Sequence, residues 1–296
     1  MSGAISRFEG LQAAPSEAKR TQDRDLQRAF GEARLRFVSK HGGTYAADLY
    51  QKAPTRVLFP GLGGAPIEAV LSNTAGGIAG GDTFSCRVSV SEGATAAVVT
   101  QAAEKVYRAL DSHACVETDL HVSDRAGLSW LPQETILFDG ARLRRRTAVH
   151  LEPKSKLVAL EWIVLGRSAR GEAVASGELS DGWRVHVDGR IVWADVLRLP
   201  PTAWREMGRS ALLADCKAFA TAIAYAPGLA DGAAEFRELL EGAPCQAGVT
   251  SVAGLLVFRF ASADAAALRS ALASFLSRAG EIALPGLFRV PKMWSC

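Results

Sequence analysis

The sequence predicts a mainly β protein whose sheets are stacked or sandwiched in a β-helix-like array, with a few α-helices near the C-terminus. Strand-like segments follow one another from about residue 32 to residue 193 with no helical segment between them. That order excludes an alternating βα fold. After Pro200 and Pro201 the composition shifts to alanine and leucine, and apolar residues recur at helical spacing. With 296 residues, of which 48% are hydrophobic, the chain is long enough to bury a sizeable core.

The domain organisation follows from composition. Residues 1–29 are polar, of mixed charge and without periodicity, so we expect a flexible N-terminal tail. We expect residues 30–296 to form a single β-rich domain, with a helical cover around residues 205–280. Deletion of residues 1–25 should therefore leave assembly with partners intact.

The cellular setting is also constrained by composition. Five cysteines are widely spaced and form no C-x-x-C pair, which argues against a disulfide framework and against a structural zinc site. The sequence shows neither a signal-peptide pattern nor an apolar run of about 20 residues. We therefore expect a cytoplasmic protein that does not insert into a membrane.

The first elements are a hairpin and a glycine-rich segment. Period-two alternation from Glu32, a turn at residues 40–43 and a return strand over 45–50 predict the hairpin. Residues 59–82 hold seven glycines around a short strand at 68–71. They lack the Lys-Ser/Thr pair of a phosphate loop and the helix of a dinucleotide fingerprint. The glycines therefore indicate a tight structural loop, and we expect valine at Gly80 or Gly81 to destabilise it.

Further strands are predicted in sequence order over residues 84–90, 94–100, 106–110, 115–122 and 156–166, and a hairpin turns at Asp188-Gly189. In the strand over 115–122, Val116, Thr118, Leu120 and Val122 face inward. The run at 156–166 is almost wholly apolar, which is typical of a strand buried on both faces.

Beyond residue 200 we expect helices at 207–225 and 233–241 and a strand at 249–260. A further helix should be capped by Ser262, Ala263 and Asp264 and closed by Gly280. The final residues should form an extended tail with Trp294 exposed.

The most unusual stretch is WLPQETILFDGARLRRR, residues 130–146. Pro132 opposes a helix, and Asp139-Gly140 is a strong turn signal, so we expect a hairpin here. On the return strand Leu143 and Arg145 alternate with three arginines that form a cationic edge, namely Arg142, Arg144 and Arg146.

Two carboxylates of this stretch, Glu134 and Asp139, could form the acid and base pair of a carboxylate-dependent hydrolase. The alternative is that Asp139 is a turn residue and Glu134 caps a bend. Glu161 lies in an otherwise apolar strand, where an unpaired charge costs several kcal/mol. It should therefore meet an arginine or line a polar channel.

Other side chains suggest weaker possibilities. His113, Cys115 and His121 share a strand face, which permits a metal site but is more often coincidence. The three arginines of the cationic edge could bind phosphate, yet they lack interleaved aromatic residues. The net charge of +3 is small against 34 basic and 31 acidic residues, so a nucleic-acid-binding β module is the least favoured class.

Three long motifs in this order resemble the UreD (UreH) family of urease accessory proteins. They are SNTAGGIAGGD (72–82), TQAAEKVYRA (100–109) and WLPQETILFDGARLRRRT (130–147). The resemblance continues through EWIVLGRSARGE (161–172) and weakly to the closing PKMWSC, so that it covers about residues 32–296.

The resemblance implies a maturation factor that is not itself an enzyme and has a β-helix-like fold. Such a scaffold would bind urease apoprotein and UreF, which recruits the GTPase UreG, so that nickel reaches the urease active site. It implies no tightly bound cofactor, only nickel in transit, and no nucleic-acid partner. Carboxylates release a late transition metal readily. We accordingly infer five candidate transient nickel ligands, namely Asp82, Glu104, Glu134, Asp139 and Glu161.

Overall fold

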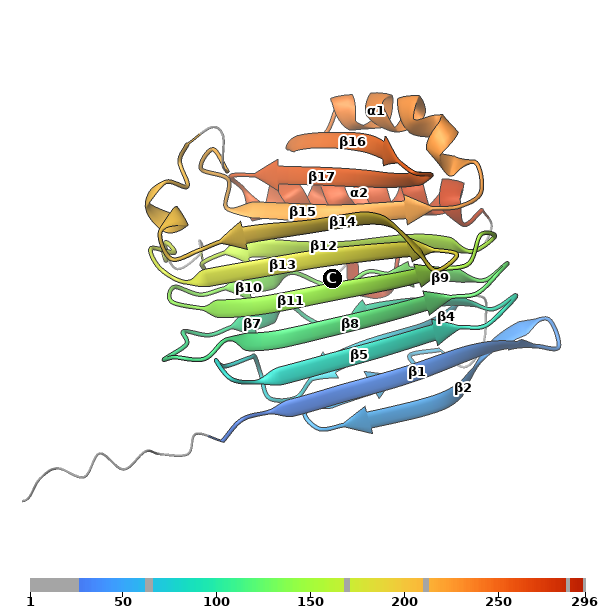
Figure 1. The fold of residues 1–296 in the computed structure, drawn as a ribbon, viewed down its shortest axis with the longest axis horizontal. Helices are drawn as coiled ribbons and strands as arrows, with labels where there is room; N and C mark the ends of the chain where they lie inside the picture. Colours follow the sequence, from blue (N-terminus) through green and yellow to red (C-terminus); the bar gives the residue numbers. More distant parts are fainter. Residues whose placement is uncertain (1–26, 62–65, 168–170, 210–212, 286–287, 295–296) are drawn as a thin grey trace, which may run out of the picture.

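Two large β-sheets pack face to face, and helices cover the outer side of one of them (Figure 1). The computed structural model describes residues 27–61, 66–167, 171–209, 213–285 and 288–294. The predicted tail at 1–29 therefore lies outside the described residues except for its last three.

The strand order defines the two sheets. The seven-stranded sheet runs β14 (Arg190–Leu199), β13 (Glu178–Val187), β11 (Arg142–Leu151), β8 (Ala114–Val122), β5 (Thr83–Val90), β1 (Phe30–Lys40), β2 (Gly43–Lys52). The ten-stranded sheet runs β16 (Gln246–Val252), β17 (Leu255–Ser262), β15 (Ala218–Tyr225), β12 (Lys156–Leu165), β9 (Gly127–Trp130), β6 (Thr95–Thr100), β4 (Ile67–Asn73), β3 (Thr55–Leu58), with β7 (Glu104–Val106) and β10 (Thr135–Leu137) beside it.

From β4 to β13 the chain winds like a β-helix. Successive long strands alternate between the two sheets, and each pairs in parallel with the strand one coil earlier, as β5, β8, β11 and β13 do in the first sheet. The strands β4, β6, β9 and β12 do the same in the second sheet. The predicted mainly β, β-helix-like class is confirmed.

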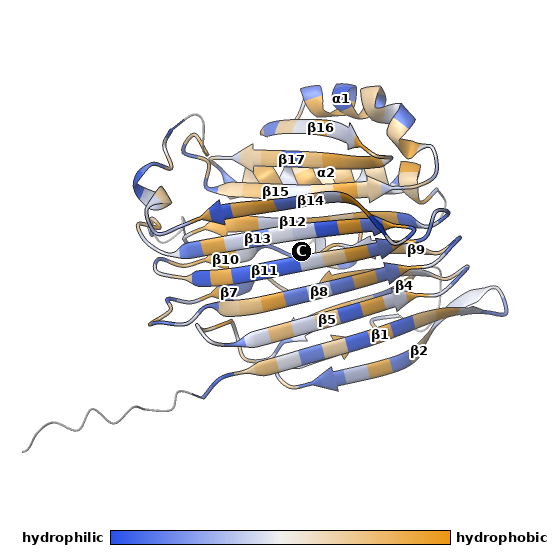
Figure 2. Ribbon diagram, viewed as in Figure 1, coloured by the Kyte–Doolittle hydropathy of each residue, from blue (hydrophilic) through white to orange (hydrophobic). Residues whose placement is uncertain are grey.

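Period-two alternation sets which side chains enter the core between the sheets. In β8, Leu120 is fully buried, whereas its neighbour His121 is half-exposed on the outer face. Figure 2 shows the same alternation of hydrophilic and hydrophobic residues along the strands of the seven-stranded sheet. The strand β12 is buried throughout apart from Lys156, as predicted, because helices cover the face that points away from the sandwich.

The stretch 130–146 is a turn between sheets and not a hairpin. β10 pairs with β7 and β12, whereas β11 pairs with β8 and β13 in the other sheet. The Asp139-Gly140 signal located the turn correctly, since Gly140 has φ +76°. The hairpin prediction was wrong because a turn sequence does not specify whether the next strand pairs with the previous one or crosses over.

The helical cover consists of α1 (Ala233–Glu241) and α2 (Ala265–Ala283), with short 3₁₀ turns at Ala203–Arg205, Leu229–Gly232 and Lys292–Trp294. Asp264 caps α2 as predicted, accepting a hydrogen bond from the Ala266 amide at 2.9 Å. The helix does not end at Gly280, which lies inside it. A Cβ there would come within 2.1 Å of the Phe288 ring, so Gly280 serves close packing. None of the helices in the described part of the chain is long and apolar enough to cross a membrane.

The predicted helix at 207–225 is wrong, since residues 218–225 form β15 in the ten-stranded sheet. Its alternate alanines, from Ala218 to Ala224, face α1 and α2, while Phe219 and Ile223 face the other way. Alanine favours helices intrinsically, but here its small side chain allows helices to pack closely on a strand, and this packing overrides propensity.

Several other boundaries also differ from expectation. The predicted strand at 249–260 is a hairpin of β16 and β17, and the strand at 106–110 is shorter and earlier, at Glu104–Val106. Trp294 is not exposed but 5% accessible, stacked 5.8 Å from Trp162. Its indole N–H donates to the Leu131 carbonyl at 3.0 Å, which fastens the C-terminal segment to the coil at 130–134.

Candidate functional site

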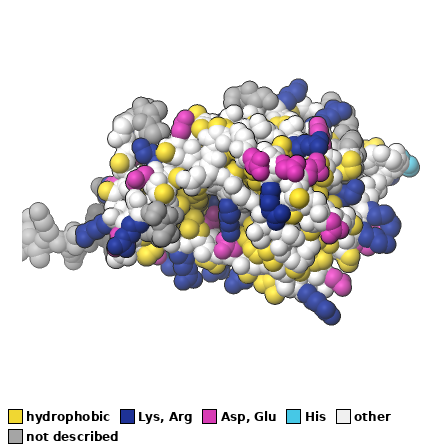
Figure 3. Space-filling view, turned by 90° about the horizontal axis from the view of Figure 1, so that it is seen from above, with side chains coloured by type: hydrophobic (Ala, Val, Ile, Leu, Met, Phe, Trp, Pro, Cys, Tyr) yellow, Lys and Arg dark blue, Asp and Glu magenta, His cyan; other side chains and the backbone are white. Residues whose placement is uncertain are grey.

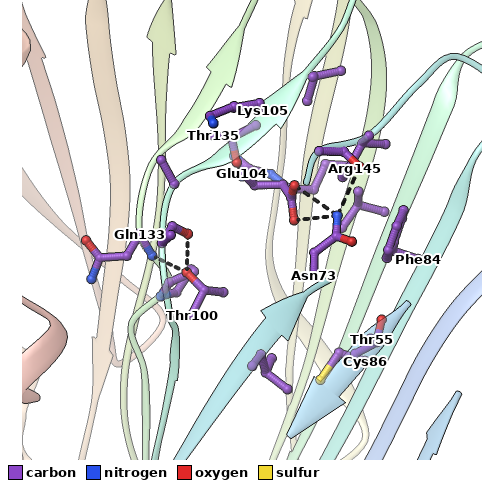
Figure 4. A pocket seen from close by; sticks show the side chains of 18 of the residues that line it. Thr55, Asn73, Phe84, Cys86, Thr100, Glu104, Lys105, Gln133, Thr135 and Arg145 are labelled. Carbon is purple, nitrogen blue, oxygen red and sulfur yellow. Dashed lines mark hydrogen bonds between the residues drawn. The ribbon is translucent and has the colours of Figure 1, made fainter. Parts of the chain in front are cut away.

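A cavity of about 350 Å³ lies where the coils at 73–104, 130–145 and 161 meet (Figure 4). Its lining mixes apolar side chains such as Phe84 and Trp130 with many polar and charged ones. Among the latter are Asn73, Cys86, Glu104, Arg145 and Glu161. They come from different coils, so the winding itself brings them together.

Glu104 begins β7 and holds its carboxylate against Asn73. The Asn73 side-chain amide donates to both carboxylate oxygens, at 3.1 and 3.2 Å, as Figure 4 shows. Asn73 is itself fixed, because its Nδ2 also donates to the Gly77 carbonyl and its Oδ1 accepts from the Ala75 amide. Burial raises the pKa of Glu104 to about 7, and the Asn73 hydrogen bond only partly opposes this rise. Glu104 therefore exchanges a proton near neutral pH.

Glu161 projects from the buried strand β12 and is partnered by Arg145 of β11. Arg145 Nη1 donates to Glu161 Oε2 at 2.7 Å, and the Trp130 indole N–H donates to Oε1 at 2.9 Å. Arg145 also binds Asp181 of β13 through two hydrogen bonds, at 2.9 and 2.7 Å. All three charged side chains are deeply buried, with accessibilities of 3%, 5% and 8%.

One guanidinium thus serves two buried carboxyl groups. Burial opposes the charge on Arg145, but Asp181 and Glu161 raise its pKa, so it remains a cation. Asp181 takes the bidentate contact, and burial raises the pKa of Glu161, with Asp181 adding to the rise that Arg145 opposes. The neighbouring Cys86 stays a thiol, because burial and then Glu161 raise its pKa to about 12.

The structure brings two of the five inferred nickel ligands to the cavity, Glu104 and Glu161. The other three are held elsewhere by local contacts. Asp82 accepts the amides of Ala29 and Ala79 at 2.8 Å each, which fixes the glycine-rich loop. Glu134 lies 3.4 Å from Arg269 of α2.

Asp139 is the third of these residues, and it organises the turn. Its Oδ1 accepts from the Ala175 and Ser176 amides at 2.9 Å and from the Ser176 hydroxyl at 3.0 Å, and its Oδ2 meets Arg108. Burial works against its charge, yet these donors lower its pKa. Glu134 and Asp139, the acid and base pair of the hydrolase alternative, are therefore each engaged by separate partners, and neither lines the cavity.

The strand face shared by His113, Cys115 and His121 does not bring the two histidines together, which agrees with the expectation that the pattern is coincidental. Eight residues of extended strand separate the two histidines by roughly 26 Å, and His113 pairs instead with Glu178 at 2.9 Å. Two of the three arginines of the cationic edge have partners. Arg146 lies 3.9 Å from the carboxylate of Glu117, and Arg142 donates a hydrogen bond to the main-chain carbonyl of Asp111.

The sequence pattern did not identify the partners of the two cavity carboxylates. Arg145 shared strand parity with Leu143 and Val149, which is a signal that it points inward, but nothing local linked it to Glu161. The sequence did not indicate that Asn73 and Asp181 belong to the site, because each contacts a residue far away in the chain. Asn73 lies 31 residues from Glu104, and Asp181 lies 36 residues from Arg145.

The lining of the cavity includes the carboxyl groups of Glu104 and Glu161. Carboxylate oxygens suit hard or borderline divalent ions and release late transition metals more easily than imidazole or thiolate does. No nucleophile is paired with a base among the described residues that line the cavity. The fold and the cavity together define a β-helix-like protein with a cavity lined in part by the carboxyl groups of Glu104 and Glu161.

Sequence comparisons identify the family to which this chain belongs. The family model described as UreD urease accessory protein matches residues 29–295. A urease accessory protein UreD of Methylobacterium sp. (strain 4-46) is 40% identical over 258 residues, 86% of this chain and 89% of the relative. That of Rhodopseudomonas palustris (strain HaA2) is 40% identical over 261 residues, 88% and 93% of the two chains. That of Magnetococcus marinus is 38% identical over 275 residues, 89% and 93%. The chain belongs to the UreD urease accessory family, and this membership supports a role in urease maturation.

Proposed function

We propose that this chain is a scaffold and metallochaperone through which nickel passes on its way to the active site of urease. The observation that carries the proposal is the cavity whose lining includes both Glu104 and Glu161, two carboxyl groups whose pKa values burial raises. Family membership indicates the process in which the chain takes part, and the cavity provides carboxyl groups that could bind a cation.

A cation entering this cavity would replace protons. Glu104 exchanges its proton near pH 7, so an arriving divalent ion displaces it at little cost. Arg145 already neutralises part of the charge on Glu161 and Asp181 and thereby limits how tightly the cluster holds a second cation. A site of this kind favours passage over storage.

The proposed route extends to the other three inferred ligands as transient contacts. Asp82, Glu134 and Asp139 keep their present hydrogen bonds in the resting protein. Of the five, Glu104 and Glu161 have the strongest structural support, since both line the cavity.

The proposed partners are the urease apoprotein and UreF, with the GTPase UreG joining through UreF, in a complex assembled in the cytoplasm. The proposal includes no tightly bound cofactor, no catalytic turnover, no nucleic acid and no membrane. Seen from the side of α1, acidic and basic side chains are interspersed (Figure 3), which argues against a surface for polyanions on that face.

The test is urease maturation with single-residue variants of this chain. Urease would be co-expressed with its accessory proteins, and nickel per urease active site would be measured by elemental analysis. Glu104→Gln and Glu161→Gln should lower nickel content several-fold while still co-purifying with UreF. Glu238→Gln, on the exposed side of α1, is the matched control and should leave nickel content unchanged.

Normal nickel loading with both Glu104→Gln and Glu161→Gln would exclude the cavity as the route. A fall in nickel content accompanied by loss of UreF binding would instead assign these residues a role in assembly. Thermal melting of the same preparations identifies any variant that is simply unfolded.

A further inference from the structure

The outer face of the seven-stranded sheet carries a ladder of three histidines that the cavity does not involve. His121, His150 and His186 occupy equivalent positions on β8, β11 and β13, because these strands pair in parallel and in register. Their rings stack, with centroids 4.5 Å apart between the first two and 4.9 Å between the last two.

Asp119 completes a group of possible metal ligands. It lies two residues before His121 on the same face of β8, and ligand atoms of Asp119, His121 and His150 all lie within 4.8 Å of one another. Asp119 Oδ1 is 2.9 Å from His121 Nε2 and 3.4 Å from His150 Nε2. Two ligands that share one ion at about 2.1 Å stand about 3.0 to 3.4 Å apart in octahedral or tetrahedral geometry. The two carboxylate-imidazole separations already match that spacing.

The hydrogen bonding of this group is incomplete. Among the described residues, none provides an aligned hydrogen bond to Asp119 Oδ1, although the two imidazoles are so close, and His186 Nδ1 is buried without a partner. Asp119 Oδ2 accepts from Arg87 Nε at 2.9 Å, which orients the carboxylate as outer partners of metal ligands commonly do. Oδ1 is thereby left turned toward the two imidazoles.

We propose that Asp119, His121 and His150 form a surface site for a late first-row divalent cation, such as Ni²⁺ or Zn²⁺, with His186 as the adjacent third imidazole. Two imidazoles and one carboxylate suit these ions better than Mg²⁺ or Ca²⁺. Binding requires the two parallel rings to tilt toward a shared ion. Their side chains, 43% and 40% exposed, have room to do so.

This site differs in donor set from the interior cavity, which offers oxygen ligands, and it does not depend on the proposed nickel route.

The experiment is isothermal titration of the untagged full chain with NiCl₂ at neutral pH. Wild type should bind one equivalent of Ni²⁺ at this site. The double variant His121→Asn/His150→Asn should bind this equivalent about tenfold more weakly or worse. His41→Asn, in the exposed turn between β1 and β2, is the matched control and should bind as wild type does. Glu104→Gln should also retain this equivalent, which separates the surface site from the cavity.

A second measurement does not depend on any variant. X-ray absorption of the chain loaded with one equivalent of Ni²⁺ should show nitrogen and oxygen ligands with the scattering pattern of imidazole. Unchanged affinity in the double variant, equal loss in His41→Asn, or sulfur ligation in the absorption spectrum would each overturn the proposal.

Discussion

Replacing Glu104 by glutamine should stabilise the protein, and the gain should grow with pH. Burial raises the pKa of Glu104 from 4.5 to about 7, so the folded chain prefers the protonated acid. The stability that protonation provides is fully present below about pH 4.5 and is lost as pH rises through about 7. Glutamine is neutral at every pH, keeps the volume of the acid and can still accept a hydrogen bond from Asn73.

The magnitude follows from the two pKa values. Ionising Glu104 destabilises the fold by about 1.4 kcal/mol at about pH 5.5 and by about 3.4 kcal/mol at about pH 8.5. The advantage of Glu104→Gln should therefore increase by about 2 kcal/mol across this interval, or roughly 4 to 8 °C in melting temperature. Partial access of solvent to the cavity mouth reduces these figures.

The assay is thermal melting of wild type, Glu104→Gln and the exposed control Glu238→Gln at both pH values. Glu238→Gln should show no pH-dependent difference from wild type. If Glu104→Gln differs from wild type by the same amount at both pH values, Glu104 does not titrate in the way its burial implies. The same variant should lower urease nickel content, so a more stable protein would be a poorer maturation factor.

Five other substitutions, one of them a control, should test the structural roles of residues in and around the cavity, the glycine-rich loop and the C-terminal segment. Arg145→Met leaves two buried carboxylates without a cation and should destabilise by about 3 to 5 kcal/mol, whereas Glu161→Gln leaves one guanidinium for one carboxylate and should change the melting temperature little. Gly80→Ala should destabilise by about 1 to 3 kcal/mol, because its Cβ would meet a backbone carbonyl at 2.5 Å. The control Gly248→Ala has open space and should melt like wild type. Trp294→Ala should cost about 3 to 5 kcal/mol in denaturant unfolding, since the indole is 5% exposed.

The requirement at Gly80 and Gly81 was anticipated from the sequence, but its physical basis differs between the two. Gly81 has φ +91°, as expected for a tight loop. Gly80 is needed because Ser112 and Ala109 approach its Cα so closely that any Cβ at this position would lie 2.5 Å from the Ser112 carbonyl oxygen. A cluster of glycines indicates that the backbone adopts conformations with positive φ. It does not indicate which distant segment packs against a given glycine, so the close contact at Gly80 could not be predicted.

The strands themselves were largely predictable, because alternation of apolar and polar residues is a local property. Which strands pair was not, because each coil meets the next one about 30 residues later. The alanine-rich β15 was misassigned for a related reason, since α2 dictates the need for small side chains there. The same limit applied to the site. Glu161 could be recognised as needing a partner, but its pairing with Arg145 depends on the register of the stacked coils.

The charge balance of the cavity favours a functional over a structural explanation. A buried ion pair is often no more stable than well-packed apolar side chains of similar volume, and here one arginine is shared by two carboxylates. Glu104, which is partly buried, adds another acid whose ionisation opposes folding near neutral pH. A protein selected only for stability would benefit from a neutral residue at that position. Under the proposed function, a cation that enters the cavity exchanges with the proton of Glu104 and offsets charge on Glu161, so that the costly burial of these groups serves a purpose.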